Sequence, residues 1–356
     1  MKIHNFSAGP SILPQEVFEE AARAVLDFNG SGLSLLEMSH RTKPFEDVMD
    51  EAHALVKELF GLSDDFSIAF VTGGASTQFF QIPMNLLNDG DKAVYIDTGV
   101  WANKAIKEAK NFGQTIVAAS SKESNYNYIP KDYIVDKDAK YLHLTSNNTI
   151  YGTQQNWWPD VEVPIVCDMS SDIFSREIPI DKFGLIYAGA QKNMGSAGVT
   201  LVAVRKDMLG HVSRTLPAML DYRTHIDNGS MYNTPPVFPI YVSMLVMRWI
   251  KKMGGVKAME TINDAKAKIL YDEIDRNPLF KGTTAVEDRS KMNVCFVMED
   301  NSMDDAFMAL TKQHGISGIK GHRSVGGFRA SIYNAMPQSS VQVLVDLMRE
   351  FEVSKG

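Results

Sequence analysis

The feature that most constrains the fold is a regular alternation of short apolar runs, rich in β-branched residues, with stretches of helical period. The runs expected as strands are residues 66–71, 93–97, 115–119, 140–145, 164–168, 184–188 and 199–204. This alternation is typical of an α/β fold in which helices flank both faces of a mainly parallel (mixed) sheet. We therefore predict a large domain over residues 16–258 built around such a sheet.

Helices precede this sheet, and a different pattern follows it. Pro14 opens a first amphipathic helix, with Gly30 just past its end, and Gly61 stops a second. Beyond about residue 260 the expected order is a helix to 276, a strand at 293–298, a helix at 304–313, a strand at 328–333 and a helix at 340–351. We predict a smaller α+β domain over residues 259–356, and we expect residues 1–15 to pack at the active site and the small domain.

Composition narrows the class of function. The formal net charge of −7 makes a nucleic acid or an anionic membrane an improbable main partner. The longest apolar stretches, such as residues 241–247, are far shorter than the ~18 residues that span a bilayer, and residues 1–10 lack the apolar core of a signal peptide. Cys167 and Cys295 lie in apolar strand-like runs, as small buried thiols do in a reducing compartment. The sequence predicts a cytoplasmic protein.

Two side chains indicate chemistry at one edge of the predicted sheet. Lys192 follows the strand at 184–188 amid small residues, and Asp168 ends the strand at 164–168. A lysine in a tight apolar setting can lose its proton and attack a carbonyl, while a poorly solvated aspartate needs a cation or a proton donor. A surface lysine and a turn aspartate are the alternatives for either residue alone. Because ligands lie beyond the carboxyl ends of parallel strands, the pair together predicts a Schiff-base site.

The turn after the first strand adds a possible phosphate cradle. Gly73 and Gly74 open a helix with small residues, which lets backbone N–H groups approach an anion, although a plain strand-to-helix turn has the same composition. The absence of a GxxxxGK[ST] or GxGxxG pattern counts against a nucleotide. A lysine, an acid and a phosphate cradle are the parts that pyridoxal phosphate requires, and Trp101 offers a flat surface for its ring.

Motifs spread over essentially the whole chain resemble those of the phosphoserine aminotransferases, fold-type I pyridoxal-phosphate enzymes of the class-V aminotransferase family. They are Asn5-Phe6-Ser7-Ala8-Gly9-Pro10, Ser39-His40-Arg41, Gly73-Gly74-Ala75-Ser76, Gly99-Val100-Trp101, Asn148-Thr149-Ile150-Tyr151-Gly152, Asp168-Met169-Ser170-Ser171, Ala190-Gln191-Lys192-Asn193, Tyr232-Asn233-Thr234-Pro235-Pro236 and Gly321-His322-Arg323 with Gly327-Phe328-Arg329-Ala330-Ser331. Each motif alone is weakly specific, but their occurrence in the family's order is highly specific.

The resemblance implies pyridoxal 5′-phosphate as the cofactor and a role for each matching residue. Lys192 would form the internal aldimine and Asp168 would contact the pyridinium nitrogen, which makes these two the catalytic residues. Trp101 would stack on the ring, and Thr149 would lie near its phenolic oxygen. The residues implied to hold the cofactor phosphate are Ala75, Ser76 and Gln191, joined by Asn233 and Thr234 from the second subunit of a homodimer.

The remaining basic residues fit an anionic substrate. A planar arginine fork orients an α-carboxylate, and Arg329 is the candidate by chemistry and by resemblance. The resemblance assigns the second anionic group, a phosphate or the side-chain carboxylate of glutamate, to His322 and Arg323 and to His40 and Arg41 of the partner subunit. Taken alone, each pair is more typical of a solvated surface cluster. Some relatives carry an arginine where this chain has Ser76. The contribution of that arginine to anion binding is therefore lost in this chain or is made by another residue.

The implied activity is a ping-pong transamination of serine biosynthesis. L-Glutamate is converted to 2-oxoglutarate, and 3-phosphohydroxypyruvate is then converted to O-phospho-L-serine. The resemblance leaves open 4-phosphohydroxy-L-threonine as a further substrate, in pyridoxine biosynthesis. Other classes remain as alternatives: a small-substrate transaminase of the alanine–glyoxylate type, a cysteine desulfurase with a reactive thiol on a mobile loop, and a non-enzymatic binding module. No metal site is expected.

Overall fold

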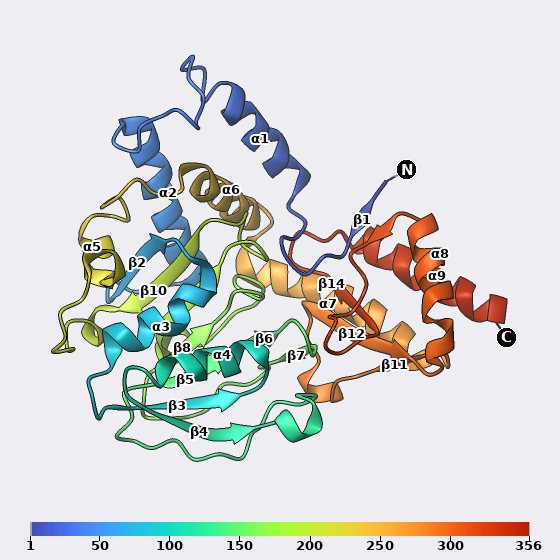
Figure 1. The fold of residues 1–356 in the computed structure, drawn as a ribbon. Helices are drawn as coiled ribbons and strands as arrows, with labels where there is room; N and C mark the ends of the chain where they lie inside the picture. The colour runs from blue at the N-terminus through green and yellow to red at the C-terminus, as the bar shows by residue number, and fades with distance from the viewer. Residues whose placement is uncertain (1, 356) are drawn as a thin grey trace.

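The computed structural model describes residues 2–355, and its largest element is a seven-stranded sheet with the order β2-β10-β9-β8-β5-β3-β4 (Figure 1). The strands are β2 (Phe66–Val71), β3 (Lys92–Asp97), β4 (Gln114–Ser120), β5 (Leu142–Thr145), β8 (Ile165–Asp168), β9 (Phe183–Gly189) and β10 (Thr200–Arg205). Only β10 runs antiparallel to its neighbours, and the other pairs of this sheet are parallel. The predicted mainly parallel, mixed α/β sheet is confirmed.

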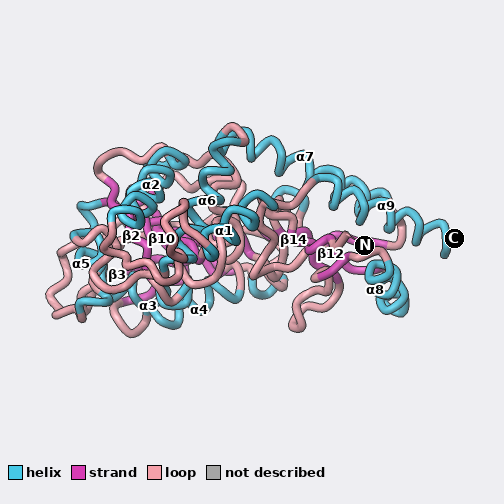
Figure 2. The backbone as a smooth tube through the Cα atoms, turned by 90° about the horizontal axis from the view of Figure 1, so that it is seen from above, coloured by secondary structure: helices cyan, strands magenta, loops and turns pink. Residues whose placement is uncertain are grey.

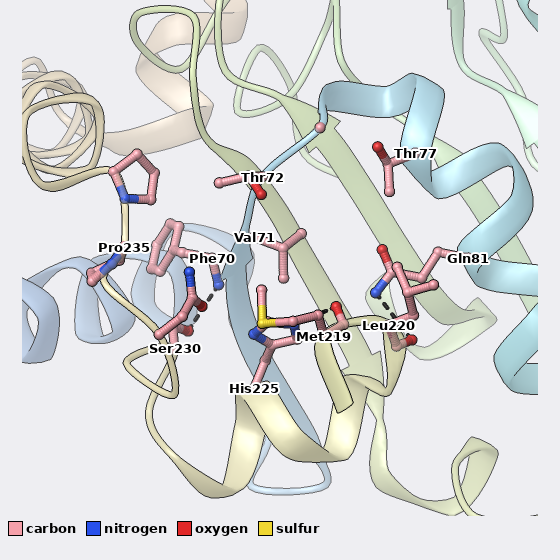
Figure 3. A pocket seen from close by; sticks show the side chains of 13 residues that line it. Phe70, Val71, Thr72, Thr77, Gln81, Met219, Leu220, His225, Ser230 and Pro235 are labelled. Carbon is pink, nitrogen blue, oxygen red and sulfur yellow. Dashed lines mark hydrogen bonds between the residues drawn. The ribbon is translucent and has the colours of Figure 1, made fainter. Parts of the chain in front are cut away.

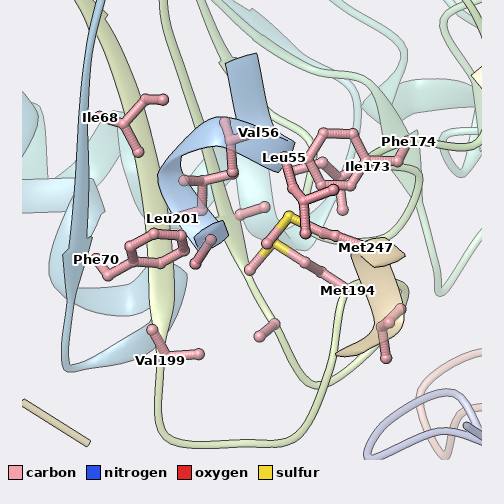
Figure 4. Close-up of a cluster of buried hydrophobic side chains, with 14 of the residues drawn as sticks. Leu55, Val56, Ile68, Phe70, Ile173, Phe174, Met194, Val199, Leu201 and Met247 are labelled. Carbon is pink, nitrogen blue, oxygen red and sulfur yellow. The ribbon is translucent and has the colours of Figure 1, made fainter. Parts of the chain in front are cut away.

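Helices cover both faces of the sheet because its strands are apolar on both sides. Along β2, Ile68 and Phe70 belong to one core, while Ala69 and Val71 belong to the other, as the two-residue period of a strand requires. The first core is completed by α1 (Gln15–Leu26), α2 (Lys43–Phe60) and α6 (Val237–Lys252), and Figure 4 shows side chains of α2 and α6 against β2 and β10. The second core includes α3 (Gly74–Leu86), α4 (Val100–Ala109) and Tyr222 of α5 (Tyr222–Asp227).

A smaller part of the chain lies at one end of the elongated molecule (Figure 2). It contains α7 (Gly255–Arg276), β11 (Phe280–Gly282), β12 (Asn293–Met298), α8 (Asp304–Gln313), β14 (Phe328–Ser331) and α9 (Gln338–Lys355). Its three strands form an antiparallel sheet with β12 in the centre, over a separate hydrophobic core. The expected boundary between residues 258 and 259 falls within α7, which packs against both α6 and α9, so the domain division stays a prediction.

The N-terminal segment joins this smaller part. Its strand β1 (His4–Asn5) pairs in parallel with β13 (Ile316–Ser317). Across residues 2–355, every helix is too short or too polar to span a lipid bilayer.

Several expected boundaries were wrong. The first helix ends at Leu26, before Gly30, because the chain reverses there through a turn in which Asn29 and Gly30 adopt positive φ. The strand expected at 328–333 ends at Ser331, and the last helix runs from Gln338 to Lys355. Short strands were not predicted, namely β1, β11, β13 and the hairpin of β6 (Asn147–Asn148) and β7 (Thr153–Gln154). Segments of two or three residues are too short to show a period.

Candidate active site

A cavity of about 410 Å³ opens where strands β2, β5, β8 and β9 end, between the large sheet and the smaller part of the chain. It brings together nine of the predicted site residues: Ala75, Ser76, Trp101, Thr149, Asp168, Gln191, Lys192, His322 and Arg329. Ala8 and Gly9 of the N-terminal segment also line it. Residues separated by up to about three hundred positions therefore meet at one hollow, at the edge that a parallel sheet favours for ligands.

Five predicted residues lie outside this cavity. Arg323 is exposed beside His322, while Arg41 and Thr234 are exposed elsewhere. Asn233 lines a second cavity of about 180 Å³, which shares Gly73 with the first and is shown in Figure 3. His40 is buried, and its Nε2 atom has no hydrogen-bond partner within residues 2–355. The four residues assigned by resemblance to a partner subunit are therefore not neighbours of this chain's own cavity.

Asp168 is held at the end of β8 by the residue two positions later. Its Oδ1 atom accepts hydrogen bonds from the backbone N–H of Ser170 at 2.9 Å and from the Ser170 hydroxyl at 2.6 Å. The Ser170 oxygen in turn accepts the N–H of Gly189 at 3.0 Å, which fixes its orientation. Burial raises the pKa of Asp168, and the hydrogen bonds from Ser170 and the charge of Lys192 act against this rise. In the described part of the chain no hydrogen bond reaches Oδ2, so this oxygen remains for a cationic donor.

Lys192 lines the same cavity with a perturbed amine. Although part of the side chain is exposed, burial lowers the pKa of Lys192, Asp168 opposes this effect and the charge of Arg329 adds to it. The Nζ atom lies 5.3 Å from the centroid of the Trp101 ring. Gly9 passes so close that an added Cβ would lie 3.3 Å from Lys192 Cγ. A lowered pKa raises the fraction of neutral amine, which is the nucleophilic form.

Trp101, Thr149 and Arg329 are linked to one another. The indole Nε1 of Trp101 donates to the hydroxyl of Thr149 at 3.2 Å, and Arg329 NH1 donates to the carbonyl of Thr149 at 2.9 Å. The Nε atom of Arg329 is buried and has no partner among the described residues. Because a buried unpaired donor is costly, this nitrogen is suited to an anion entering the cavity.

The turn between β2 and α3 is shaped for a phosphate. Gly73 and Gly74 have φ of +96° and +66°, and an added Cβ on Gly73 would lie 1.9 Å from Thr77 Oγ1. The helix begins at Gly74 without a side-chain cap, so the N–H groups of its first turn remain available to an anion. Gln191 lies beside this turn, since an added Cβ on Gly189 would be 2.9 Å from Gln191 Oε1 and 3.5 Å from Ala75 N.

These groups fit pyridoxal phosphate one by one. A nucleophilic amine, a carboxylate oxygen without a partner, an indole ring and a helix N-terminus all line one cavity. The hydroxyl of Thr145, at the end of β5 on the cavity wall, is also buried and has no partner within residues 2–355. Fold and site together define a pyridoxal-phosphate enzyme of fold type I.

Ser170 and Thr145 are among the lining residues for which the sequence predicted no role. Ser170 was quoted in the motif that begins with Asp168, and its spacing of two residues from an aspartate is typical of a local turn that could have indicated the contact. Thr145 is a polar residue at the end of a predicted strand, which is the same signal that identified Asp168.

The two thiols argue against a desulfurase. Cys167 and Cys295 are both free and buried, and burial raises the pKa of Cys295 to about 12 and the pKa of Cys167 well above its usual value. Neither lies on a loop with a reactive thiolate, which removes the basis for a desulfurase. In residues 2–355 no three His, Cys, Asp or Glu side chains are grouped so as to hold a metal ion.

Comparisons with known proteins agree with this class. The chain matches the family described as aminotransferase class-V over residues 3–344. It is 60% identical over 353 residues to the phosphoserine aminotransferase of Flavobacterium psychrophilum, with 99% of each chain covered. The phosphoserine aminotransferase of Bacillus circulans subsp. alkalophilus superimposes with a TM-score of 0.97 at 47% identity, covering 100% of this chain and 99% of the other.

A third relative contains the cofactor. The PLP-bound phosphoserine aminotransferase of Trichomonas vaginalis has a TM-score of 0.93 at 39% identity, covering 98% of this chain and 100% of the other. The chain belongs to the class-V aminotransferase family, and within it to the phosphoserine aminotransferases. The residues that line the cavity of this chain fit the same cofactor, pyridoxal 5′-phosphate.

Proposed function

We propose that the chain catalyses ping-pong transamination between L-glutamate and 3-phosphohydroxypyruvate, giving 2-oxoglutarate and O-phospho-L-serine, in serine biosynthesis. The observation that carries this proposal is that Asp168, Lys192 and Arg329 line one cavity in a chain so similar to phosphoserine aminotransferases. The second basic cluster, beginning with His322, favours a substrate with a second anionic group over the alanine–glyoxylate pair.

Lys192 and Asp168 perform the central steps. When bound, pyridoxal phosphate supplies an aldehyde that exchanges amino groups and a ring that stores electrons. The Lys192 amine would hold the cofactor covalently until the amino group of the substrate replaces it. The released amine would then carry a proton from the substrate Cα to the former aldehyde carbon of the cofactor. Asp168 Oδ2 keeps the ring nitrogen protonated, while Ser170 holds the other carboxylate oxygen. Ala75, Ser76 and Gln191 bind the cofactor phosphate beside the helix N-terminus.

The small part of the chain binds the substrate anions. Arg329 takes the α-carboxylate, with its unpaired Nε as one donor and Thr149 anchoring its NH1. His322 lies on the same wall, and burial together with the charges of Arg329 and Arg323 lowers its pKa. An anion beside this imidazole would favour its protonated form, so the same group can meet either a phosphate or a carboxylate.

We further propose that the protein is a cytoplasmic homodimer whose active sites are shared. The partner subunit would supply His40, Arg41, Asn233 and Thr234. The buried Nε2 of His40, which has no partner within residues 2–355, supports this assignment. So do the exposed side chains of Leu26, at the end of α1, and of Leu33 and Leu36, between α1 and α2. The two free cysteines support a reducing compartment. Activity toward 4-phosphohydroxy-L-threonine is part of the proposal, because this molecule carries the same amino acid and phosphate groups.

The absorption spectrum of the purified protein tests the function. Glutamate should convert the cofactor band to that of the amine form, and 3-phosphohydroxypyruvate should restore it in the same sample. A protein without a cofactor band would be a binding module, contrary to the proposal. Cycling with alanine and glyoxylate, but not with the phosphorylated substrate, would identify the small-substrate transaminase instead.

A further inference from the structure

Lys266 is a fully buried lysine in α7, outside the cavity, and it binds the segment that follows β14. Its Nζ atom donates to the carbonyl oxygens of Ile332, Tyr333 and Asn334, at 3.1, 2.7 and 3.4 Å. An ammonium group has three N–H donors, one for each of these carbonyls. The strand that carries Arg329 therefore leads into a turn held by a single lysine side chain.

A second run of three consecutive carbonyls lies in the large part of the chain. The carbonyls of Ile173, Phe174 and Ser175 accept hydrogen bonds from three different asparagine amides. The donors are Asn193 at 2.8 Å, Asn334 at 3.0 Å and Asn263 at 3.0 Å, respectively. Phe174 has φ of 55°, a left-handed conformation that bulky residues rarely adopt, so these amides hold a backbone shape that would not persist by itself.

The three asparagines are also bonded to one another. Asn263 Nδ2 donates to Asn334 Oδ1 at 2.8 Å, and the backbone N–H of Asn334 donates to Asn193 Oδ1 at 2.9 Å. All three side chains are buried, and Asn263 lies one turn before Lys266 on α7. Buried polar networks of this kind favour one arrangement of the elements they join, because other arrangements leave more polar atoms unpaired; here only the Oδ1 atom of Asn263, among the three asparagine side chains, has no partner within residues 2–355.

This network touches both walls of the cavity. Asn193 directly follows Lys192, and the turn held by Lys266 begins three residues after Arg329. The hydroxyl of Tyr333 in the same turn donates to the carbonyl of Ala8, which lines the cavity. Hydrogen bonds and two short backbone segments thus join the wall that carries the amine to the wall that carries the carboxylate-binding arginine.

We propose that Lys266 is a positioning residue, which sets the place of Arg329 relative to Lys192 by holding the 332–334 turn against the asparagine network. The inference rests on the proposed transamination, in which Arg329 binds the substrate carboxylate. Burial lowers the pKa of Lys266 to about 7, whereas the three carbonyl oxygens favour its charged form. Within residues 2–355 no carboxylate forms an ion pair with it, so the backbone oxygens alone compensate its charge.

The first experiment replaces Lys266 by methionine, which keeps the length of the side chain and removes its donors. Because a misplacement of about 1 Å at a binding group can cost up to about a hundredfold, we expect kcat/KM for glutamate to fall about tenfold, mainly through KM. The cofactor band and the cofactor dissociation constant should not change. Lys268→Met is the matched control, since Lys268 lies on the same helix but is exposed and paired with Asp272.

A double variant separates positioning from general stabilisation. If Lys266 acts through Arg329, then Lys266→Met added to Arg329→Lys should cost little more than Arg329→Lys alone. Additive losses, an unchanged kcat/KM in the folded single variant, or a loss confined to cofactor affinity would each overturn the inference.

Hydrogen exchange of the cofactor-free protein supplies a readout that does not depend on turnover. Lys266→Met should exchange faster in residues 328–336 and 173–176, and not in β2. Asn263→Ala should show the same faster exchange. If Lys266→Met does not fold, the exchange rates of Asn263→Ala test the role of the network, and unchanged rates in both segments would refute it. Failure of the unmodified protein to transaminate refutes the proposed function, whereas equal exchange rates in the variant and the unmodified protein refute the role of Lys266.

Discussion

The two walls of the cavity are built differently. On the cofactor wall, Asp168 and Ser170 are buried at the end of a central strand, with each hydrogen bond of the pair between 2.6 and 3.0 Å. On the anion wall, His322 precedes the exposed residues Arg323, Ser324 and Val325. The His322 Nδ1 atom is bonded to the side chain of Ser324 within the same loop. The large sheet holds the groups of the cofactor wall, whereas the anion wall combines Arg329 on β14 with His322 and Arg323 on a short surface loop.

This difference suits the two tasks. A ring nitrogen and an aldehyde carbon have one fixed separation, so a rigid frame of strands serves them. A phosphate and a carboxylate differ in size and in the number of oxygens, so side chains with fewer fixed contacts can meet both. Burial on the first wall disfavours the charged forms of both groups, since it raises the pKa of Asp168 and lowers that of Lys192, and it also strengthens the attraction between their charges. Solvent screens the exposed charge of Arg323 on the second wall. Substitutions on the cofactor wall should therefore cost more.

Lys192→Ala should have the largest effect. Loss of the amine removes both the covalent link and the proton transfer, and turnover should fall roughly 10⁴-fold. The cofactor band and steady-state turnover measure this. Lys104→Ala is the control, because Lys104 lies 4.7 Å from the centroid of the same Trp101 ring but is exposed. A variant that keeps its band and its turnover would remove Lys192 from the mechanism.

Asp168→Asn should cause the second-largest loss of turnover. The amide oxygen can still accept from Ser170, but a neutral amide cannot keep the ring nitrogen protonated. Breaking a buried charge pair costs about 3–5 kcal/mol, which corresponds to roughly two to four orders of magnitude in turnover. Cofactor should remain bound in spectra of the purified variant. Near-normal turnover at saturating substrate would contradict the assigned role.

Arg329→Lys should cause a smaller loss of activity than Asp168→Asn, and it tests the contact between the two walls. A lysine keeps the charge but lacks the planar fork, so the loss should be about 1.5–3 kcal/mol, or about ten- to a hundredfold in kcat/KM for glutamate. Titration with cofactor should give the affinity of the unmodified protein. A loss of cofactor binding equal to the loss in kcat/KM would place this arginine on the other wall.

The double variant His322→Ala, Arg323→Ala tests the anion wall itself. Each exposed charge contributes up to about 1 kcal/mol, so kcat/KM for 3-phosphohydroxypyruvate should fall about tenfold. Half-reaction rates with a substrate that lacks the second anionic group should hardly change. Full retention of activity with the phosphorylated substrate would favour the alanine–glyoxylate type of transaminase.

His53→Gln should leave turnover unchanged. This variant tests whether burial shifts the pKa of a side chain outside the active site as well. Burial lowers the pKa of His53, which stacks on Phe70, to about 4. Between pH 6.5 and 4 the unfolded chain binds this proton and the folded chain does not, so stability falls as the pH drops through this window.

Between pH 7 and 5 the His53→Gln variant should lose about 2 kcal/mol less stability than the unmodified protein. Urea unfolding at both pH values measures the difference, and His211→Gln, at an exposed histidine, is the control. Equal losses of stability in the variant and the unmodified protein would contradict the lowered pKa of His53.

Much of the large sheet could be predicted because its strands are buried on both faces and carry that burial in their composition. The expected strand at 184–188 differs from β9 by one residue at each end, and β2 matches its prediction. Asp168 and Lys192 were found for the same reason, since a polar residue where an apolar strand ends must face the ligand edge. Lys266 was not found, because a lysine in a helix gives no local sign that it is buried.

The sequence by itself determined the α/β class, the strand ends that carry the acid and the amine, and the family. Only the tertiary structure decided which side chains share the cavity, that Arg323 stands outside it, and that asparagines from three distant segments meet beneath it. The physical reason is the distance along the sequence over which each kind of interaction acts. Periodicity and turn chemistry act over a few residues, whereas the hydrogen bonds that join β14, α7 and the Lys192 turn connect positions 66 to 141 residues apart.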